Sequence, residues 1–428
     1  MKTSIWFAQK LAFSKQKQFT SIIIRIAIAA VALSSMIVII AISTVDGFQQ
    51  SISAKIFGFW GHIHIASPSL SFSHEYTPLE ARPSLLDSIQ SIGKIKKPPT
   101  IEGNHFFPNT RDSTIGGVKY VTPYILKAGV IKTKSNIEGV IFKGIASITP
   151  IEEYLIEKPK NWSTDSTSEE SPIILSVTTA NRLNTKINNR VLIYFEKGGE
   201  LIPHRFIVSG IYKTGLEEYD KTFAIVPINT LINLLNFDKN SCTGIEVTLD
   251  HLDDIDYFDQ YIYQNILPPN LVSETIIEKN PNIFDWLSLQ KINAVVILTL
   301  MFLVAIINMT TSLLILILER TNMIGILKSI GYRNWTIRKI FLYHSLYISF
   351  VGISIGVGLG LLICYIQKSY GILRLNEAEY YLSTVPIFVT WWKVLGVVGL
   401  FMVVILFSLI LPTYLVTKIK PVNAIRFK

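Results

Sequence analysis

The sequence predicts an α-helical membrane protein with four transmembrane helices and a large α/β domain between the first and second helices. Its 428 residues are 49% hydrophobic and only 17% charged, which is too apolar for an ordinary soluble protein. Four stretches reach the roughly 20 apolar residues that cross about 30 Å of hydrocarbon. Residues 46–287, which separate the first stretch from the second, are polar enough to fold in water.

The expected transmembrane helices cover residues 22–45, 290–318, 341–366 and 391–415. The first could be mistaken for a cleaved signal peptide, but its apolar core exceeds the roughly 7–15 residues of a signal. It also leads directly into Asp46 and Gly47, so we expect an anchor that is retained. Before it, apolar residues alternate with lysines in residues 1–21. That leader fits an amphipathic helix in the headgroup plane and a simple basic flank equally well.

The positions of Lys and Arg near the four spans predict the orientation. Three regions are enriched in them: the leader with the first residues after it (Lys2, Lys10, Lys15, Lys17, Arg25), residues 319–340 (Arg320, Lys328, Arg333, Arg338, Lys339) and the tail at 416–428 (Lys418, Lys420, Arg426, Lys428). By the positive-inside rule these regions are cytoplasmic. The large domain and the short loop at 367–390 are then outside.

The net charge of +9 does not predict a nucleic-acid partner. Most of the basic excess is explained by membrane orientation, and no patch interleaves basic residues with stacking aromatics. The two cysteines, Cys242 and Cys364, fall in the external domain and the third span. They predict neither a disulfide nor a metal site.

The external domain reads as mixed α/β. Strand-like runs cover residues 61–67, 137–145, 189–195, 204–212, 223–228, 245–249 and 271–278, and helix-like runs cover 83–92 and 255–266. The strand-helix pieces at each end flank a more strand-rich middle. We therefore expect one domain with a strand-rich subdomain inserted at about residues 110–240.

Enzyme signatures are missing from the chain. It has no phosphate-binding loop, no H-E-x-x-H and no G-x-S-x-G. His62 and His64 lie two apart on a predicted strand and share one face, but no third metal ligand accompanies them. No catalytic residue, metal or cofactor is expected in this chain.

Four segments carry a family resemblance. STVDGFQQSISAKIFGFWGHIHI (43–65) and VSGIYKTGLEEYDKTFAIVPI (208–228) resemble segments of the periplasmic domain in the LolC/LolE lipoprotein-releasing permeases, of the FtsX/MacB-like superfamily. ERTNMIGILKSIGYRNWTIRKIFL (319–342) resembles that family's cytoplasmic coupling segment, and PVNAIRFK (421–428) its tail. The last two motifs recur across the wider superfamily.

The resemblance implies the permease subunit of an ABC transporter, with a MacB-like external domain, in a Gram-negative inner membrane. Such a subunit extracts lipoproteins and passes them to a LolA-like periplasmic carrier. It works with a second permease subunit and a separate LolD-like ATPase dimer, which holds the ATP and Mg²⁺. Two alternatives remain open: an FtsX-like protein that regulates a cell-wall hydrolase, and a MacB-type exporter.

The coupling segment is the first candidate site. On a helix, Ile324, Leu327 and Ile330 share one face while Lys328 and Arg333 point elsewhere, and Gly331 can end the helix. The alternative is an ordinary basic loop. The resemblance assigns ATPase coupling to Glu319, Arg320, Ile324, Gly325, Leu327, Lys328, Gly331 and Arg333.

The resemblance also implies a carrier-binding hairpin, called the hook, and a lipid cavity. The hook corresponds to Gly198, Gly199, Leu201, Ile202 and Pro203, and it is shorter here than is typical of LolC. It therefore leaves open a LolC-like, a LolE-like or a homodimeric role. The cavity lining corresponds to Ile39, Ile42, Val45 and Phe48 of the first span and Ile297, Met301, Val304 and Ile307 of the second.

Overall fold

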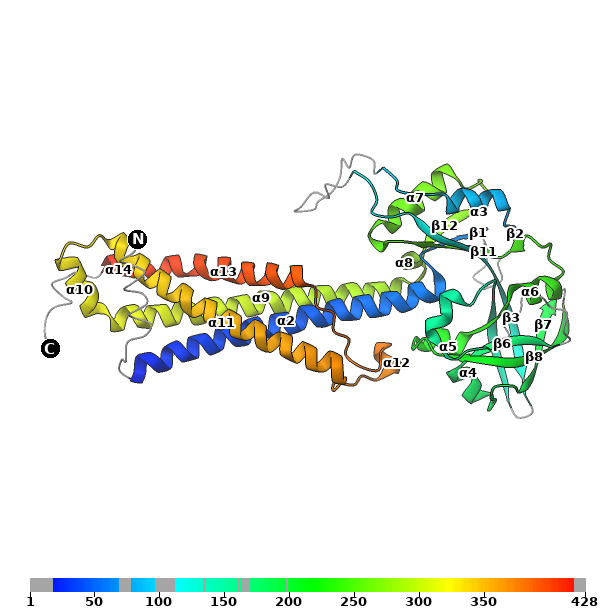
Figure 1. The fold of residues 1–428 in the computed structure, drawn as a ribbon, viewed down its shortest axis with the longest axis horizontal. Coiled ribbons are helices and arrows are strands. Elements are labelled where there is room, and N and C mark those ends of the chain that lie inside the picture. The colour runs from blue at the N-terminus through cyan, green and yellow to red at the C-terminus, as the bar shows by residue number, and fades with distance from the viewer. Residues whose placement is uncertain are drawn as a thin grey trace. The chain divides into compact units, whose positions relative to one another are not determined.

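The computed structural model describes residues 18–68, 78–96, 112–133, 136–159, 162, 170–197 and 199–418. The chain divides into two compact units (Figure 1). The helical unit contains residues up to 50, 285–374 and from 384 onward, and the strand-rich unit contains residues 51–284 and 375–383. Among the described residues, four helices are long and apolar enough to cross a membrane. The predicted fold class, four such helices with a strand-rich domain between the first two, is confirmed.

Three of the four long helices extend beyond the predicted spans, whereas the fourth, at 391–413, ends two residues before its predicted span of 391–415. The helices of the helical unit are α2 (Gln18–Trp60), α9 (Pro281–Glu319), α10 (Thr321–Ser329), α11 (Asn334–Tyr370), α13 (Trp391–Thr413) and α14 (Leu415–Lys418). At 1.5 Å per residue the 43 residues of α2 measure about 65 Å, twice the hydrocarbon thickness. The end of the apolar run at residue 45 marks the end of the span but not of the helix. Ile52, Ile56 and Phe59 continue a helical apolar stripe, and all three are buried.

Helix α11 packs on α2 through glycines spaced four residues apart. A Cβ on Gly352 would lie 3.0 Å from Val31 Cβ, and one on Gly360 would lie 3.2 Å from Ile39 Cβ. A Cβ on Gly356 would overlap the Ser35 hydroxyl and the Ala32 carbonyl. These small residues therefore allow close approach of the two helices, as the repeated small-xxx-small pattern predicts.

The strand-rich unit holds all the strands of the described residues and several short helices. The strands are β1 (Ile63–Ala66), β2 (Leu79–Glu80), β3 (Val118–Lys132), β4 (Ile137–Ile145), β5 (Leu155–Glu157), β6 (Ser171–Ser176), β7 (Arg190–Lys197), β8 (Glu200–Tyr212), β9 (Phe223–Pro227), β10 (Ser241–Cys242), β11 (Gly244–Leu249) and β12 (Val272–Thr275). The helices are α3 (Pro83–Gln90), α4 (Val177–Arg182), α5 (Glu217–Thr222), α6 (Ile228–Leu235), α7 (Ile255–Asn265), α8 (Ile276–Lys279) and α12 (Glu377–Tyr380), with 3₁₀ turns η1 (Thr149–Tyr154) and η2 (Leu252–Asp254).

Six of these strands close into a ring. β3 pairs with β4, β4 with β9, β9 with β6, β6 with β8, β8 with β7, and β7 returns to β3. Phe142, Phe195 and Phe206 are buried and in mutual contact, with ring centroids 4.8 to 6.4 Å apart. The ring strands come from residues 118–227, within the range expected for the inserted subdomain.

Outside the ring, β5 pairs with β8, and the other part of the sheet runs in the order β12-β1-β11-β3. The 15-residue strand β3 belongs to both parts, because its first half pairs with β11 and its last residues pair with β7. One continuous strand therefore joins the two parts of this unit. The predicted strand at 271–278 ends earlier than expected, since Thr275 and Glu278 form a capping box that starts α8.

We predict that Gly356→Val destabilises the α2–α11 contact by about 1–3 kcal/mol, because the side chain would overlap backbone atoms of α2. Gly358, two residues away on α11, has no neighbouring atom within 4 Å of the position that a Cβ would take, so Gly358→Val is the matched control. The measurement is the thermal unfolding midpoint of the purified chain in detergent. Equal shifts for both variants would contradict the packing.

His62, directly before β1, predicts that the stability of the strand-rich unit falls at acidic pH. His62 Nδ1 accepts a hydrogen bond from the Leu249 amide at 2.7 Å. Burial, with a contribution from Lys119, lowers the pKa of His62 to about 4 from its ordinary 6.5. The folded state therefore binds fewer protons than the unfolded chain between these values, so the stabilisation is complete above pH 6.5 and is lost as pH falls toward 4.

At about 1.4 kcal/mol per pKa unit, the loss attributable to His62 is roughly 3 kcal/mol. We expect the unfolding midpoint of the strand-rich unit to fall between pH 7 and pH 4.5, and His62→Gln to reduce that fall because glutamine does not titrate. The exposed His251 supplies the control, His251→Gln. An unchanged pH dependence in His62→Gln would argue against this origin.

Candidate functional site

The segment between α9 and α11 forms a separate short helix, α10 (Figure 1). Its carboxyl end is a Schellman motif: Tyr332 N–H donates to Leu327 O and Gly331 N–H to Lys328 O, both at 3.0 Å. Gly331 has a φ of +93°, a left-handed conformation that favours glycine. The prediction that Gly331 ends this helix agrees with that geometry.

The inner face of α10 is anchored in the core of the helical unit. Ile324 and Leu327 belong to the buried cluster that also contains Ile317, Phe341 and Val416. Gly325 is buried between them in sequence. Because α9, α11 and α14 all contribute to this cluster, displacement of α10 strains the packing of each of them.

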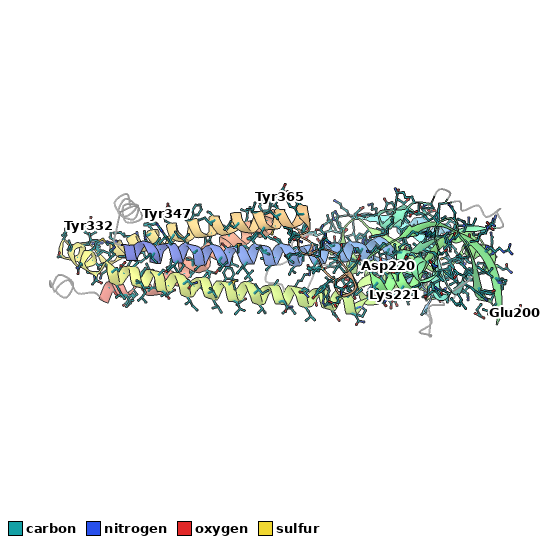
Figure 2. All side chains as sticks on the ribbon, turned by 90° about the horizontal axis from the view of Figure 1, so that it is seen from below. Glu200, Asp220, Lys221, Tyr332, Tyr347 and Tyr365 are labelled. Carbon is teal, nitrogen blue, oxygen red and sulfur yellow. The ribbon has the colours of Figure 1, made fainter. Side chains whose placement is uncertain are left out.

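The face expected to carry Ile324, Leu327 and Ile330 is divided in the structure. Ile330 is 69% exposed, because it is the residue at which the helix ends and the left-handed Gly331 turns the chain away. Tyr332 packs against the buried cluster instead, and Figure 2 shows it near one end of the helical unit.

Lys328 reaches back to the bundle. Its Nζ donates to the carbonyls of Val416 at 2.7 Å and Thr417 at 3.3 Å. Arg338 reaches the Ile410 carbonyl and the Thr413 hydroxyl, both at 3.4 Å. Pro412 lies near the end of α13, and the backbone hydrogen bonds of the helix are interrupted between α13 and α14. The two cations therefore bond to oxygen atoms on both sides of this interruption.

The outer face of this region is apolar and cationic. Ile326, Ile330 and Trp335 are 51%, 69% and 55% exposed, and Arg333 beside them is exposed as well. Glu319 and Arg320 occupy the junction at which α9 ends and α10 begins. Ile326 and Ile330 are thus exposed at α10, whereas Lys328 is bonded to α14.

The predicted hook is the hairpin of β7 and β8. Lys197 and Glu200 are the last residues paired in the antiparallel strands. Gly199 has a φ of +84°, and no atom lies within 4 Å of the position that a Cβ would take there. Gly198 lies outside the described residues. Leu201 is 65% exposed, Pro203 is exposed and Ile202 is half-buried. Figure 2 shows Glu200 at the tip. The hairpin offers two apolar side chains beside a tight turn.

The residues predicted for the lipid cavity fall into two groups. Ile39 is 1% exposed and packs against Gly360 of α11. Ile42 and Val45 are half-buried, as is Phe48, whose ring meets Trp286 edge-on with centroids 6.2 Å apart. On α9, by contrast, Ile297, Val304 and Ile307 are exposed and Met301 is half-buried. α9 therefore presents an exposed apolar stripe, whereas Ile39 of α2 is covered by α11.

Sequence reasoning missed Ile326 and Trp335. Ile326 is two residues from Ile324, so a helical projection does place it on the opposite face, and that signal was available. Trp335 lies in the first turn of α11, beyond the expected coupling helix. Residues 1–17 of the predicted leader (1–21) and residues 419–428 of the predicted tail (416–428) lie outside the described residues.

The comparisons with known proteins decide the family. The family of MacB-like periplasmic core domains matches residues 26–262, more than half of the chain. The FtsX-like permease C-terminal family matches residues 295–421.

The chain belongs to the FtsX/MacB-like permeases.

Within these permeases, the chain is similar to LolC and LolE proteins over nearly its whole length. The lipoprotein-releasing system transmembrane protein LolC of Neisseria meningitidis serogroup B is 23% identical over 98% of this chain and 97% of that protein. LolE of Haemophilus influenzae is 20% identical over 99% of both. The resemblance to the LolC/LolE family is thereby confirmed.

A solved structure, the extracellular domain of the noncanonic ABC-type transporter YknZ from Gram-positive bacteria, covers 50% of this permease and 99% of that chain. It is 14% identical, with a TM-score of 0.32.

Proposed function

We propose that this chain is the transmembrane permease subunit of an ABC transporter that extracts lipoproteins from the inner membrane and hands them to a periplasmic carrier. The observation that carries the proposal is the end-to-end similarity to lipoprotein-releasing LolC and LolE proteins. The geometry of α10 supports the same role, because a short helix anchored on one face and apolar on the other suits a contact with a moving partner.

The partner that drives transport is a separate ATPase dimer, which supplies ATP and Mg²⁺ chemistry that this permease does not perform. It binds the outer face of α10 on the cytoplasmic side, and both termini share that side. The positive-inside distribution of Lys and Arg supports this orientation. The strand-rich unit then lies in the periplasm.

The energetic demand of extraction favours a paired permease. Removing three acyl chains, on the order of 45 methylenes at about 0.8 kcal/mol each, gives up roughly 35 kcal/mol of burial. The chains must therefore stay in apolar surroundings throughout. The exposed α9 stripe of Ile297, Val304 and Ile307 supplies one wall, and a second permease subunit supplies the opposing wall.

We expect Ile330→Asp to weaken co-purification of the ATPase subunit at least about tenfold, because a carboxylate buried against an apolar partner costs more than about 1.4 kcal/mol. Release of lipoprotein to the carrier falls with it. The control is Ile156→Asp, since Ile156 is 59% exposed on the strand-rich unit. Retained ATPase binding in Ile330→Asp would exclude this face of α10.

The hook has its own test. Leu201→Asp or Pro203→Asp should abolish pull-down of the periplasmic carrier without lowering stability, since both side chains are exposed. Ile202→Asp should act in the same direction. Tyr263→Asp, a change at a 54% exposed residue of α7, is the control, and unchanged carrier binding in the hairpin variants would count against a hook here.

Whether lipoproteins are the cargo is tested by crosslinking in cells. A photoreactive residue at Ile307 should trap labelled acyl chains when the ATPase is present. Capture of a cell-wall hydrolase by the strand-rich unit, with no acyl chains at Ile307, would favour the FtsX-like alternative instead.

A further inference from the structure

The connection between α11 and α13 contains a segment that belongs to the strand-rich unit. Residues 375–383, here called the strap, group with that unit, whereas the residues directly before and after them group with the helical unit. The strap is closed on itself, because Leu375 N–H donates to Ser383 O at 3.0 Å and Tyr381 N–H to Glu377 O at 2.9 Å. It is a small folded loop around α12.

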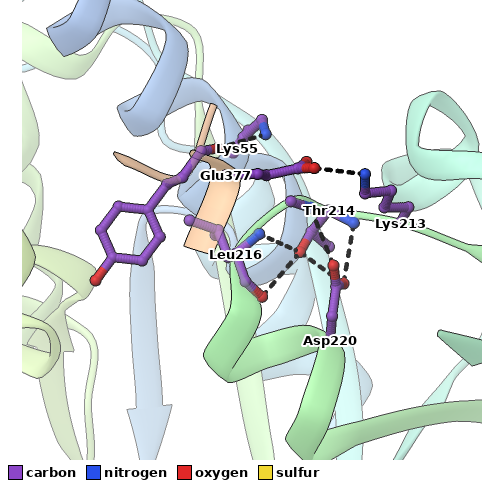
Figure 3. A network of polar contacts seen from close by, with 8 residues as sticks. Lys55, Lys213, Thr214, Leu216, Asp220 and Glu377 are labelled. Carbon is purple, nitrogen blue, oxygen red and sulfur yellow. Dashed lines mark hydrogen bonds and ion pairs between the residues drawn. The ribbon is translucent and has the colours of Figure 1, made fainter. Parts of the chain in front are cut away.

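Two lysines of the strand-rich unit hold the strap (Figure 3). Lys213 Nζ forms an ion pair with Glu377 Oε2 at 2.6 Å. Lys55 Nζ donates to the Tyr381 carbonyl at 2.9 Å. Tyr381 has a φ of +60°, which is costly for a residue with a side chain, so the hydrogen bond from Lys55 stabilises a conformation the strap would otherwise avoid.

The surface that receives the strap requires a glycine. A Cβ on Gly215 would lie 2.8 Å from Glu377 Oε1 and would collide with Lys55 Nζ. Gly215 also has a φ of +75°, a conformation that favours glycine. Substitution there would displace the ion pair and the lysine together.

The receiving turn is fixed from within its own unit. Asp220, only 4% exposed, accepts hydrogen bonds from Thr214 N–H at 3.0 Å, the Thr214 hydroxyl at 2.8 Å and Gly215 N–H at 3.1 Å. The Thr214 hydroxyl in turn accepts from Leu216 N–H at 3.0 Å. The turn between β8 and α5 is therefore held by hydrogen bonds that involve no residue of the strap.

The same place also holds the end of α2. The Tyr154 hydroxyl donates to the Ala54 carbonyl at 3.1 Å, and Gly58 leaves room for that ring. Lys213 N–H donates to Tyr154 O at 2.9 Å. Lys55 of α2, Lys213 of the β8–α5 connection and the strap thus converge on one surface.

We propose that the strap is a releasable coupling element, with Lys55, Lys213 and Glu377 as the positioning residues that attach it. α2 and α9 join the strand-rich unit to membrane helices through the chain itself, and the strap adds an attachment to the α11–α13 pair through side chains. Lys213 and Glu377 are 43% and 32% exposed, and ion pairs this accessible to water are weak. The attachment can therefore open and close during a transport cycle, and this consequence rests on the proposed function.

The attachment is tested by hydrogen exchange on the full-length chain in detergent. We expect Lys213→Glu and Glu377→Lys each to speed exchange of the Tyr380 and Tyr381 amides at least about fivefold, and the double variant Lys213→Glu/Glu377→Lys to restore protection. The control is Lys221→Glu, which breaks the neighbouring half-exposed ion pair with Glu217 on α5 without touching the strap. Unchanged exchange in both single variants would overturn the attachment.

The role in coupling is tested on the assembled transporter. Each single reversal should lower lipoprotein released per ATP hydrolysed at least about fivefold, with the ATPase rate itself retained and the double reversal restoring release. Normal release per ATP in variants whose strap exchanges rapidly would overturn the coupling role. A wild-type transporter that releases no lipoprotein would refute the proposed function, while the exchange result would still decide the attachment.

Discussion

The structure depends on how the outer end of α2 is fixed in the strand-rich unit. Lys143 of β4 is fully buried; its Nζ donates to the Phe59 carbonyl at 2.5 Å and pairs with Glu246 of β11 at 2.6 Å. It also lies 4.2 Å from the centre of the Trp60 ring. Burial lowers the pKa of Lys143 and raises that of Glu246, and each is partly offset by the charge of the other. Removing one member of such a pair typically costs about 3–5 kcal/mol, because the other charge is left buried and alone.

This interaction satisfies the end of the 43-residue helix α2. The last carbonyls of a helix lack intrahelical partners, and here a buried ammonium supplies one to Phe59 while β4 and β11 hold that ammonium in place. Ile52 and Ile56 are fully buried in the same unit. The end of α2 is thus part of the core of the strand-rich unit, and a displacement of this end has to displace the sheet with it.

The sequence was sufficient for elements whose physics is local. Apolar length predicted four spans, alternation predicted β4 at residues 137–145, and Gly331 marked the end of α10 because a left-handed residue is needed there. Interactions between segments that are distant in the sequence could not be predicted from it. Nothing near Lys143 in sequence indicates that it meets Phe59 and Glu246, and Glu377 reads as an ordinary loop acid until Lys213 is seen beside it. Ile330 was misplaced because a helical projection assumes that the helix continues.

Exposed apolar residues on α9 and on α10 differ in how strongly they support a protein partner. Hydrocarbon is as apolar as the side chains of the α9 stripe, so lipid contact there costs nothing, and exposure alone is weak support for a protein partner. Ile326, Ile330 and Trp335 lie among Asn322, Ser329, Arg333 and Asn334, and such polar neighbours are typical of a segment outside the hydrocarbon. In water each Å² of apolar surface costs about 25 cal/mol, and Trp335 keeps over half of its surface accessible. A face of this kind is stabilised when a protein covers it, so the outer face of α10 is stronger support for a docked partner than the longer stripe on α9.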